Sequence, residues 1–587
     1  MSKQLNLGLL IGIILMSILT SGPNIPVTRA TPATIVVPDD YPSIQEAINS
    51  AVDGDTVFVR TGTYYEHVIV NKTISLVGED VSTTIIDGSN TGHVVYVVRN
   101  NVNITGFTVR NSGNVHMPNL DAGICLNGTT GCVISENHVV DNGFAGISLL
   151  SSQYSKITCN NVSGTGWGGI HLMNSSRNTV TGNILDSNGQ QQQWGGGING
   201  HAGSHYNNIT DNTIVSCVYG MFYHDARYNS ICRNNISATS AIGIWFQDTV
   251  SHNTVAENNF ANCTVGIFLE GPNTNNTLSK NFITESEYGI KILSAQSNRV
   301  VNNTIMNNRA GSDLWRAGIR LEGGGYSQIH SNLVSGNYYG VLLYSSSPYV
   351  SVYGNNISNN EFGLRVASGG SGYLNMTRNV VAGNVGYGIG LTGFTSSSNY
   401  ALLANNTIIN NGQGVSIGQY SNYNTVSQNY ITQNDCGLYL EYSTGNSIYG
   451  NSLVSNDQQV SIESGSVSRW NSSYPLGGNY WNDYSGMDQF SGPYQNVTGS
   501  DGMGDTPYII DANNTDYFPL MLPYNPSPVG GDLNADGSVD IFDIVIVALE
   551  FGKPPPPITD TRADVNKDGQ VDIFDIAIVA IHFGETG

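Results

Sequence analysis

Two segments near the end of the chain carry oxygen-bearing residues at the spacing of a calcium loop. The first holds Asp532, Asn534, Asp536, Ser538, Asp540 and Asp543. The second holds Asp564, Asn566, Asp568, Gln570, Asp572 and Asp575. These residues fill the ligand positions of a 12-residue loop, and Gly537 and Gly569 stand at position 6, where the chain must turn sharply. Two acidic turns are the alternative, but two full matches at one offset favour two Ca²⁺ sites.

A second group of chemically capable residues recurs through the middle of the chain, at steps of about one repeat. Its aromatic members would stack on sugar rings and its ionisable members would act as acids, bases or charge partners. We treat Phe222, Trp245 and Phe268 as candidate sugar-binding residues. The candidate catalytic residues are His201, His224, Asp225, Asp248, Glu270, Lys291 and Arg320.

This group is compatible with two kinds of reaction. Asp225 and Asp248 would lie about 5 Å apart on neighbouring coils, which is the carboxylate separation of retaining glycosidases. The same pair could hold Ca²⁺ beneath a uronate, with Lys291 or Arg320 as the base and a histidine as acid or base. A decorated solvent face is the simpler alternative, with Trp245 packed under the inserted segment 190–194.

A repeated sequence motif predicts the elements that position these residues. Glycine followed by apolar residues at alternate positions recurs, mostly every 23 residues, beginning at Gly123, Gly146 and Gly169. An asparagine keeps its own register between these glycines, at 137, 160, 183, 212, 234, 258, 281, 303, 332, 355, 379, 406, 429 and 451. Period-two apolar patterning predicts short strands, and a fixed period of this length predicts a solenoid.

We therefore predict a mainly β fold, a right-handed single-stranded parallel β-helix with a small all-α calcium-binding domain at its C-terminus. The handedness follows from the rule for parallel crossovers. Residues one and three after each glycine should point inward, and residues two and four outward. The asparagines should bond one another along the stack, because buried amides need partners.

Composition excludes nucleic-acid binding, and the N-terminal residues indicate where the protein is located. Charged residues make up 11% of the chain and the formal net charge is -22, so the chain would repel nucleic acid. Residues 1–30 are expected to be a secretory signal peptide, with an apolar run and small residues at Ala30. We expect a secreted or cell-surface protein with no membrane span after signal removal. Cys125 and Cys132 could pair, but stacked core thiols are favoured for the seven cysteines.

The chain divides into five further segments. Residues 34–100 are expected to form an N-terminal cap with first coils and a short amphipathic helix near residues 44–51, and residues 101–465 the β-helix repeats. Residues 466–525 should form a C-terminal cap, residues 526–531 a linker, and residues 532–587 the paired calcium loops, each followed by one apolar helix, at 544–551 and 576–583. In the C-terminal cap, Asp501 and Asp505 could hold a third calcium ion, although a glycine turn is slightly favoured there.

Two resemblances follow from these motifs. The opening VPDDYPSIQEAINSAVDGDTVFVRTGTYYE, the Asn/Gly coils and the closing GNYWNDYSG and DGMGDTPYIID resemble the NosD-like β-helix family. This resemblance implies secretion and the β-helix fold; copper handling, linked to founding members, is a low-rated alternative because no Met/His/Cys cluster is visible. The paired loops resemble a type I dockerin, which implies calcium and a cohesin-like or cell-surface partner. Ile-Phe at loop positions 10 and 11 departs from partner-reading dockerins and puts the usual cohesin in doubt.

Three functions compete at this point. The first is a secreted β-helix that binds polysaccharide and, if it is an enzyme, acts as a polysaccharide lyase or glycoside hydrolase. The second is a non-catalytic surface, adhesive or spacer protein. The third is the copper-handling function.

Overall fold

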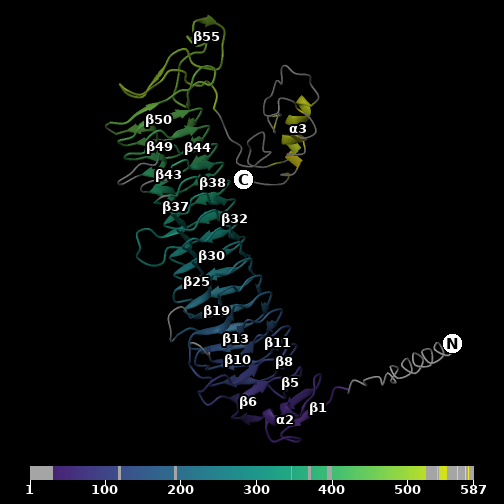
Figure 1. Ribbon diagram of the computed structural model, residues 1–587. Helices are drawn as coiled ribbons and strands as arrows, with labels where there is room; N and C mark the ends of the chain where they lie inside the picture. Colours follow the sequence, from purple (N-terminus) through teal and green to yellow (C-terminus); the bar gives the residue numbers. More distant parts are fainter. Residues whose placement is uncertain are drawn as a thin grey trace, which may run out of the picture.

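The computed structural model describes residues 31–523, except 117–119, 191–194, 346, 368–371, 393–398 and 464. Near the C-terminus it describes residues 539, 541–551, 563, 565, 571, 575–576, 579–580 and 583. The described residues between 31 and 523 form one long column, with β1 (Thr34–Val37) at one end and β55 (Phe490–Ser491) at the other (Figure 1). The predicted signal peptide and linker lie outside the described residues.

Each coil contributes three parallel strands, one to each of three sheets. In one coil these are β23 (Ser230–Cys232), β24 (Asn235–Ser237) and β25 (Ile242–Gln247). Sheet A contains β23 and runs from β1 (Thr34–Val37) to β53 (Val467–Arg469). Sheet B contains β24 and runs from β3 (Gly62–Tyr64) to β54 (Tyr480–Trp481). The predicted right-handed parallel β-helix is thereby confirmed.

Sheet C contains β25 and is built mainly from strands of five or six residues. Its strands are β4 (Val68–Val70), β7 (Val95–Val97), β10 (Ala122–Asn127), β13 (Ala145–Leu150), β16 (Gly168–Met173), β19 (Gly196–His201), β22 (Tyr219–His224), β25, β28 (Val265–Glu270), β31 (Tyr288–Leu293), β34 (Ala317–Glu322), β37 (Tyr339–Tyr344), β40 (Phe362–Ala367), β43 (Tyr387–Thr392), β46 (Gln413–Ile417), β49 (Cys436–Leu440) and β52 (Gln458–Ile462). The repeated glycine of the sequence is the second residue of most of these strands. At Gly266, a Cβ atom would lie 2.6 Å from the carbonyl oxygen of Gly289 in the next coil, so a side chain would not fit.

The core lies inside the coils and is continuous along the column. Residues one and three after the repeated glycine are fully buried, for example Ile267 and Leu269. A short helix, α2 (Ile44–Ser50), lies at the N-terminal end and buries Ile44, Ala47 and Ile48. Ser43 caps it, because its hydroxyl accepts a hydrogen bond from the Glu46 N–H. Helix α2 is where the sequence predicted a helix, near residues 44–51.

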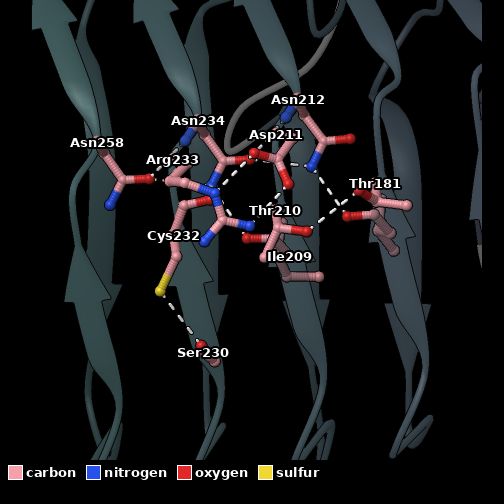
Figure 2. A network of polar contacts seen from close by, with 11 residues as sticks. Thr181, Ile209, Thr210, Asp211, Asn212, Ser230, Cys232, Arg233, Asn234 and Asn258 are labelled. Atoms are coloured by element: carbon pink, nitrogen blue, oxygen red, sulfur yellow. Dashed lines mark hydrogen bonds and ion pairs between the residues drawn. The ribbon is translucent and has the colours of Figure 1, made fainter.

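The predicted asparagine ladder occupies the corner between sheets A and B. Figure 2 shows three of its members, Asn212, Asn234 and Asn258, on successive coils. The Asn234 side-chain N–H donates to the Asn258 Oδ1 at 2.9 Å and to the Ile209 carbonyl oxygen at 3.0 Å. The Asn234 backbone N–H donates to the same Asn258 Oδ1 at 2.9 Å. The buried amides are therefore satisfied by the neighbouring coils, as expected.

Two further ladders stand at the other two corners. Between sheets B and C the ladder includes Asn308, Asn337 and Asn360, and between sheets C and A it includes Asn229, Asn253 and Asn276. We did not predict these ladders. In several coils Ser, Thr or Cys replaces Asn, as at Thr165 and Cys263, which breaks the pattern in the sequence.

An exposed row of tyrosines, here called the tyrosine ridge, precedes the ladder between sheets C and A. Its members are Tyr206, Tyr228, Tyr326, Tyr349, Tyr373, Tyr400 and Tyr423, with φ from 57° to 61°. A bulky residue is uncommon at positive φ. Neighbouring rings in the ridge stack with centroids 4.9–5.8 Å apart and planes within 15°. Ring stacking between coils offsets the cost of this backbone conformation.

The C-terminal cap closes the first ladder with a buried carboxylate. Asn451 donates to Asn479, and the Asn479 backbone N–H donates to Asp516 Oδ2 at 2.7 Å. The Trp481 indole N–H donates to the same oxygen at 2.9 Å, and the Phe518 N–H donates to Oδ1 at 3.1 Å. Burial raises the pKa of Asp516 to about 6, although these hydrogen bonds lower it.

The seven cysteines all lie within the described residues and are free thiols. Cys125, Cys132, Cys217 and Cys263 are buried, as the core-thiol prediction expected, whereas Cys232 and Cys436 are half-buried and Cys159 is exposed. Cys125 and Cys132 do not pair, and burial raises the pKa of the Cys125 thiol to about 12.

Candidate functional site

The outward stripe predicted from the sequence lies on the outer face of sheet C. Strand pairing aligns Asn199 with Phe222, Phe222 with Trp245, and Trp245 with Phe268. It then aligns Phe268 with Lys291 and Lys291 with Arg320. The structure thus brings the candidate residues onto consecutive coils, each about 4.8 Å from the next.

The three candidate sugar-binding aromatics form one cluster. The centroids of Phe222 and Trp245 are 4.9 Å apart, and those of Trp245 and Phe268 are 6.3 Å apart. Val265 and Tyr288 complete the cluster. The rings point away from the core yet are largely covered, with Trp245 only 8% exposed, because each ring packs against its neighbours. The three rings therefore point outward, as predicted, but are not freely exposed to solvent.

The acidic candidates lie beside the ring cluster and have different partners. His224 Nε2 lies 3.0 Å from Asp248 Oδ2, with both side chains partly exposed. Asp225 instead accepts from the Thr249 hydroxyl at 3.4 Å and lies 3.8 Å from the Arg227 guanidinium. Glu270 accepts a 3.0 Å hydrogen bond from the Trp245 indole N–H. Asp248 and His224 thus form a contact pair, whereas Asp225 turns toward other groups.

The basic candidates occupy the next two coils. The Lys291 ammonium lies 5.1 Å from the ring centroids of both Phe268 and Tyr288, and within the described residues it forms no salt bridge. Burial, with the nearby positive charge of Arg320, lowers the pKa of Lys291. A lowered pKa leaves more of the lysine as the neutral amine that a general base needs, while its protonated form would attract an anionic ligand.

Arg320 is more tightly held than Lys291. Its guanidinium donates to Glu322 at 2.9 Å and to the Tyr288 hydroxyl at 3.1 Å, and lies 3.8 Å from Asp313. Its side chain is only 10% exposed. Burial raises the pKa of Asp313, but hydrogen bonds from Tyr288 and the Trp315 N–H, with the charge of Arg320, lower it overall. Arg320 therefore orders the loop that contains Asp313 and has few free donors.

At the other end of the stripe lies a group of uncharged polar residues. Ser148 aligns with His171, His171 aligns with Asn199, and His201 lies beside His171 with ring centroids 5.4 Å apart. Trp167 stacks edge-on against His171 at 4.9 Å and tilted against His201 at 5.3 Å. We name Ser148, His171, Asn199 and His201 the neutral cluster.

The neutral cluster is buried without hydrogen-bond partners. Ser148 and Asn199 are fully buried and His171 is 2% exposed. Among the described residues, no partner reaches the Ser148 hydroxyl, His171 Nδ1, His201 Nε2 or either polar atom of the Asn199 amide. Each unsatisfied buried group costs about 1–3 kcal/mol. Such a concentration is unusual in a chain whose ladders satisfy their buried amides.

Both histidines of the cluster, buried His171 and half-buried His201, are uncharged at neutral pH. Burial lowers the pKa of His201 to about 4, and the neighbouring His224 and His116 lower it further. Burial also lowers the pKa of His171 well below its ordinary value, assisted by His201 and His116. Of this cluster, only His201 was a predicted site residue. Ser148, His171 and Asn199 share the outward stripe, and Gly168 and Gly196, where later coils carry Tyr or Ile, leave the room that the Asn199 amide occupies.

The calcium-loop prediction falls mostly outside the described residues. Asp543 and Asp575 are described and buried, while the other ten predicted ligands lie outside. Helix α3 (Ile541–Glu550) begins three residues before the predicted start at 544. Val539, Val547, Ala563, Val571 and Val579 form a small apolar core, and the Val565 N–H donates to Asp575 at 2.7 Å.

Asp501 and Asp505 in the C-terminal cap accept backbone hydrogen bonds. Asp505 accepts from the N–H groups of Gln489 and Phe490, and Asp501 accepts from the N–H of Gly492. These contacts fit the structural alternative, a glycine turn. Within the described residues, no three His, Cys, Asp or Glu side chains converge as a metal site. No helix in that part of the chain is long and apolar enough to cross a membrane.

Comparison with family models places the chain in a class. A model described as right handed beta helix region matches residues 52–214, 93–260, 192–305 and 228–381, which together cover more than half of the chain. The chain therefore belongs to the right-handed β-helix family. A model described as periplasmic copper-binding protein (NosD) matches residues 365–486, and residues 530–583 match the dockerin type I domain. Both resemblances stated from the sequence are confirmed.

Individual relatives match only in part. A probable ABC transporter binding protein NosD of Stutzerimonas stutzeri is 32% identical over 109 residues, 18% of this chain and 22% of that protein. A cell surface glycoprotein of Methanothermus fervidus is 33% identical over 107 residues, 18% of this chain and 16% of that protein. The chain thus spans about a fifth of the length of these curated relatives. An alginate lyase structure from Paenibacillus sp. str. FPU-7 shares 13% identity, with a TM-score of 0.34, over 46% of this chain and 94% of that one.

Proposed function

We propose that this protein binds polysaccharide along the outer face of sheet C and is attached to a partner through its dockerin domain. The observation that carries the proposal is the in-register series Phe222, Trp245, Phe268 and Lys291 on four consecutive coils. Aromatic rings with polar neighbours suit sugar rings, which present apolar faces and hydroxyl edges. A series that repeats every coil suits a polymer better than a small molecule.

The polar groups around the rings supply contacts to sugar hydroxyls. His224 and Asp248 lie beside the aromatic cluster and are 44% and 56% exposed, so both are open to a ligand. Lys291 adds a cation without a salt-bridge partner in the described part of the chain. This cation would attract an acidic sugar in a chain that is otherwise strongly acidic.

A glycan array tests binding. We expect the parent to bind at least one glycan from a panel of polyuronides, neutral polymers and mixed polymers. Trp245→Ala should lower the affinity for that glycan about tenfold, or ~1.4 kcal/mol, through loss of ring contact. Tyr349→Ala, on the exposed tyrosine ridge, is the matched control and should bind like the parent. A parent that binds no glycan, or a Tyr349→Ala variant that loses as much affinity as Trp245→Ala, would refute the proposed site.

Catalysis is a further step that the same face could support. The His224–Asp248 pair would act as acid or base, with Glu270 nearby, and Lys291 would abstract a proton in a lyase. Asp225, His201 and Arg320 are placed less directly, because Asp225 contacts Thr249 and Arg227, the Nε2 of half-buried His201 is covered, and Arg320 is paired. Asp248→Asn should abolish turnover and retain binding, while Asp211→Asn, a salt-bridged surface aspartate on another face, should leave turnover unchanged. A lyase would give an unsaturated product that absorbs in the ultraviolet, and a hydrolase would release reducing ends.

A non-catalytic surface or spacer protein is the second candidate. The observation that favours it is the separation of Asp225 and Asp248 onto different partners, which leaves no obvious carboxylate pair. Binding without turnover in the same assay would support this function.

The dockerin domain would provide attachment. The paired loops of residues 532–575 would bind two calcium ions, and metal binding would supply folding free energy, because the empty loops gather mutually repelling carboxylates. In the full chain, chelation should abolish the calcium-dependent binding of a cohesin-type partner and leave glycan binding unchanged. Asp532→Ala should weaken the first site and spare most of the second. Partner binding that persists in chelator would contradict this role.

A further inference from the structure

Unlike the amides of the asparagine ladders, the polar groups of the neutral cluster lack hydrogen-bond partners among the described residues. The ladder amide of Asn234 donates to two oxygens and its corner is fully connected. The amide of Asn199 is equally buried but, among the described residues, has no partner for its nitrogen or its oxygen. Its neighbours Ser148 and His171 are buried and unpartnered as well. Three such residues on successive coils mean that the fold retains polar groups which it does not itself satisfy.

The position of these side chains directs them away from the core. Ser148, His171 and Asn199 occupy the second position after the repeated glycine, the same outward column that contains Phe222 and Trp245. Gly168 and Gly196 leave room for the Asn199 amide, since a Cβ atom on Gly168 would lie 2.6 Å from the Asn199 nitrogen. A larger residue at these positions, such as the Tyr219 or Ile242 of later coils, would crowd this amide. The unpartnered groups therefore lie on the outer side of sheet C but are closed off from solvent, so a sugar would reach them only by displacing the residues that cover them.

The chemistry of the neutral cluster suits an uncharged ligand. A hydroxyl, an amide and two neutral imidazoles each offer donors and acceptors, and no lysine or arginine is among them. The Trp167 and Phe222 rings flank the histidines, with the Phe222 centroid 5.1 Å from that of His201. Hydroxyl groups both donate and accept, and a pyranose ring presents an apolar face to aromatic side chains. A carboxylate or phosphate would find no positive charge here.

We infer that Ser148, His171, Asn199 and His201 form a subsite that binds an uncharged, hydroxyl-rich sugar residue of the polysaccharide. This inference rests on the proposed function and names the kind of sugar at one end of its site. Lys291 lies four coils beyond Asn199, at roughly 19 Å, so an acidic sugar bound there belongs to another part of the same polymer. The ligand class is thus a glycan that carries both neutral and acidic residues.

Two substitutions in the full chain separate this subsite from a structural role. Asn199→Leu removes an unsatisfied amide, so the ligand-free variant should melt at or above the temperature of the parent. Asn258→Leu removes a fully bonded ladder amide and should melt well below it. His171→Phe is a second variant with the same expectation as Asn199→Leu. If Asn199→Leu and His171→Phe both melt far below the parent, the cluster is part of the structural framework and the subsite is refuted.

The binding readout uses glucomannan as the neutral probe, polygalacturonate as the acidic probe and glucuronoxylan as the mixed probe. Asn199→Leu should lower the affinity for glucomannan and glucuronoxylan at least tenfold and leave polygalacturonate binding unchanged. Lys291→Met should show the reverse preference, and Lys280→Met, a surface lysine on another face, is its control. If the parent binds and Asn199→Leu binds all three probes equally well, the subsite alone is overturned. If the parent binds acidic glycans only, the subsite alone is also overturned, and if it binds no glycan of the array, the proposed function fails and the subsite with it.

Discussion

Asn258 and Asn199 are both fully buried asparagines, but their side-chain amides differ in hydrogen bonding. Asn258 lies in the ladder between sheets A and B, where it donates to Ile231 at 2.9 Å and to Asn281 at 3.0 Å. Its Oδ1 accepts two hydrogen bonds from Asn234. Asn199 lies on the outer face of sheet C, where no described residue reaches its amide.

The difference separates two reasons for burying a polar group. In the ladders, neighbouring coils supply the partners, so the polar residues bring the stack into register and contribute to folding. On sheet C, the neighbouring coils supply aromatic walls instead, and the partners have to come from outside the chain. Burial alone does not point to a site, whereas several unpartnered buried polar groups on successive coils require an explanation.

The largest effect that would sharpen this comparison comes from two adjacent residues of β28. Ile267 points inward and is fully buried, whereas Phe268 points outward. Ile267→Asp would place an unpaired carboxylate between coils and should prevent folding, because an isolated charge in an apolar core costs many kcal/mol. Phe268→Asp should fold, with a lower melting temperature and weakened glycan binding. Circular dichroism and thermal melting check both. An Ile267→Asp variant that melts like the parent would show that the inward register is wrong.

The next effect concerns the end of the ladder at Asp516. Its pKa in the folded state, about 6, is above the ordinary value of 3.8, so ionisation is disfavoured in the folded protein. The stability that this group contributes is fully present below pH ~4 and is lost as the pH rises through about 6. The difference in pKa corresponds to roughly 3 kcal/mol.

Denaturant unfolding at several pH values measures this effect. Between pH 4 and pH 7, the free energy of unfolding of the parent should fall relative to that of Asp516→Asn, which cannot ionise. Parallel curves for the two proteins would contradict the raised pKa. Asp211→Asn controls for the general charge of the surface.

A smaller effect comes from the ladder amide itself. Asn258→Ala should lower the free energy of unfolding by about 1–3 kcal/mol, because Asn234 and Ile231 lose buried partners. Asn199→Ala should change it by only a few tenths of a kcal/mol, since no described partner is lost. Urea unfolding of both variants makes the comparison, and equal losses would remove the distinction between the two asparagines.

The smallest effect concerns the tyrosine ridge, an exposed stack of rings that lies outside the proposed binding site. Tyr349→Asn relieves the positive φ but removes two ring stacks, at 5.1 and 5.3 Å. We expect a net loss of about 0.5–1 kcal/mol and unchanged glycan binding. A variant that is more stable than the parent would show that the stacking does not offset the backbone cost.

The inside of the coil was largely predictable from the sequence, and the outside was not. The repeated glycine with its alternating apolar residues, as at Gly266 and Ile267, predicts the strand register. One asparagine per coil predicts the first ladder. The ladder between sheets B and C was missed because Thr165 and Cys263 stand in for Asn, and the ladder between sheets C and A because Ser155 and Ser327 do. Asp516 was missed because it meets Asn479 across 37 residues of irregular chain.

On sheet C, the sequence placed residues in a stripe but could not say which of them found partners. Asp225 and Asp248 were expected about 5 Å apart on neighbouring coils; in the structure Asp225 accepts a hydrogen bond from Thr249, and Asp248 lies against His224. Phe222 and Trp245 were expected to be exposed, and ring packing covers them. His171 and Asn199 share the stripe with the chosen candidates, but only the structure shows that they are buried and unpaired.

Hydroxyl-radical footprinting of the full chain tests most directly whether a glycan binds to the outer face of sheet C. The comparison is internal to one sample. His224 and Met173 report on sheet C, and Tyr349 and Tyr373 report on the tyrosine ridge. A saturating glycan chosen by the array should lower the oxidation rates of His224 and Met173 at least threefold and leave the two tyrosines unchanged. Protection of the ridge alone, or no protection on sheet C, would contradict the account.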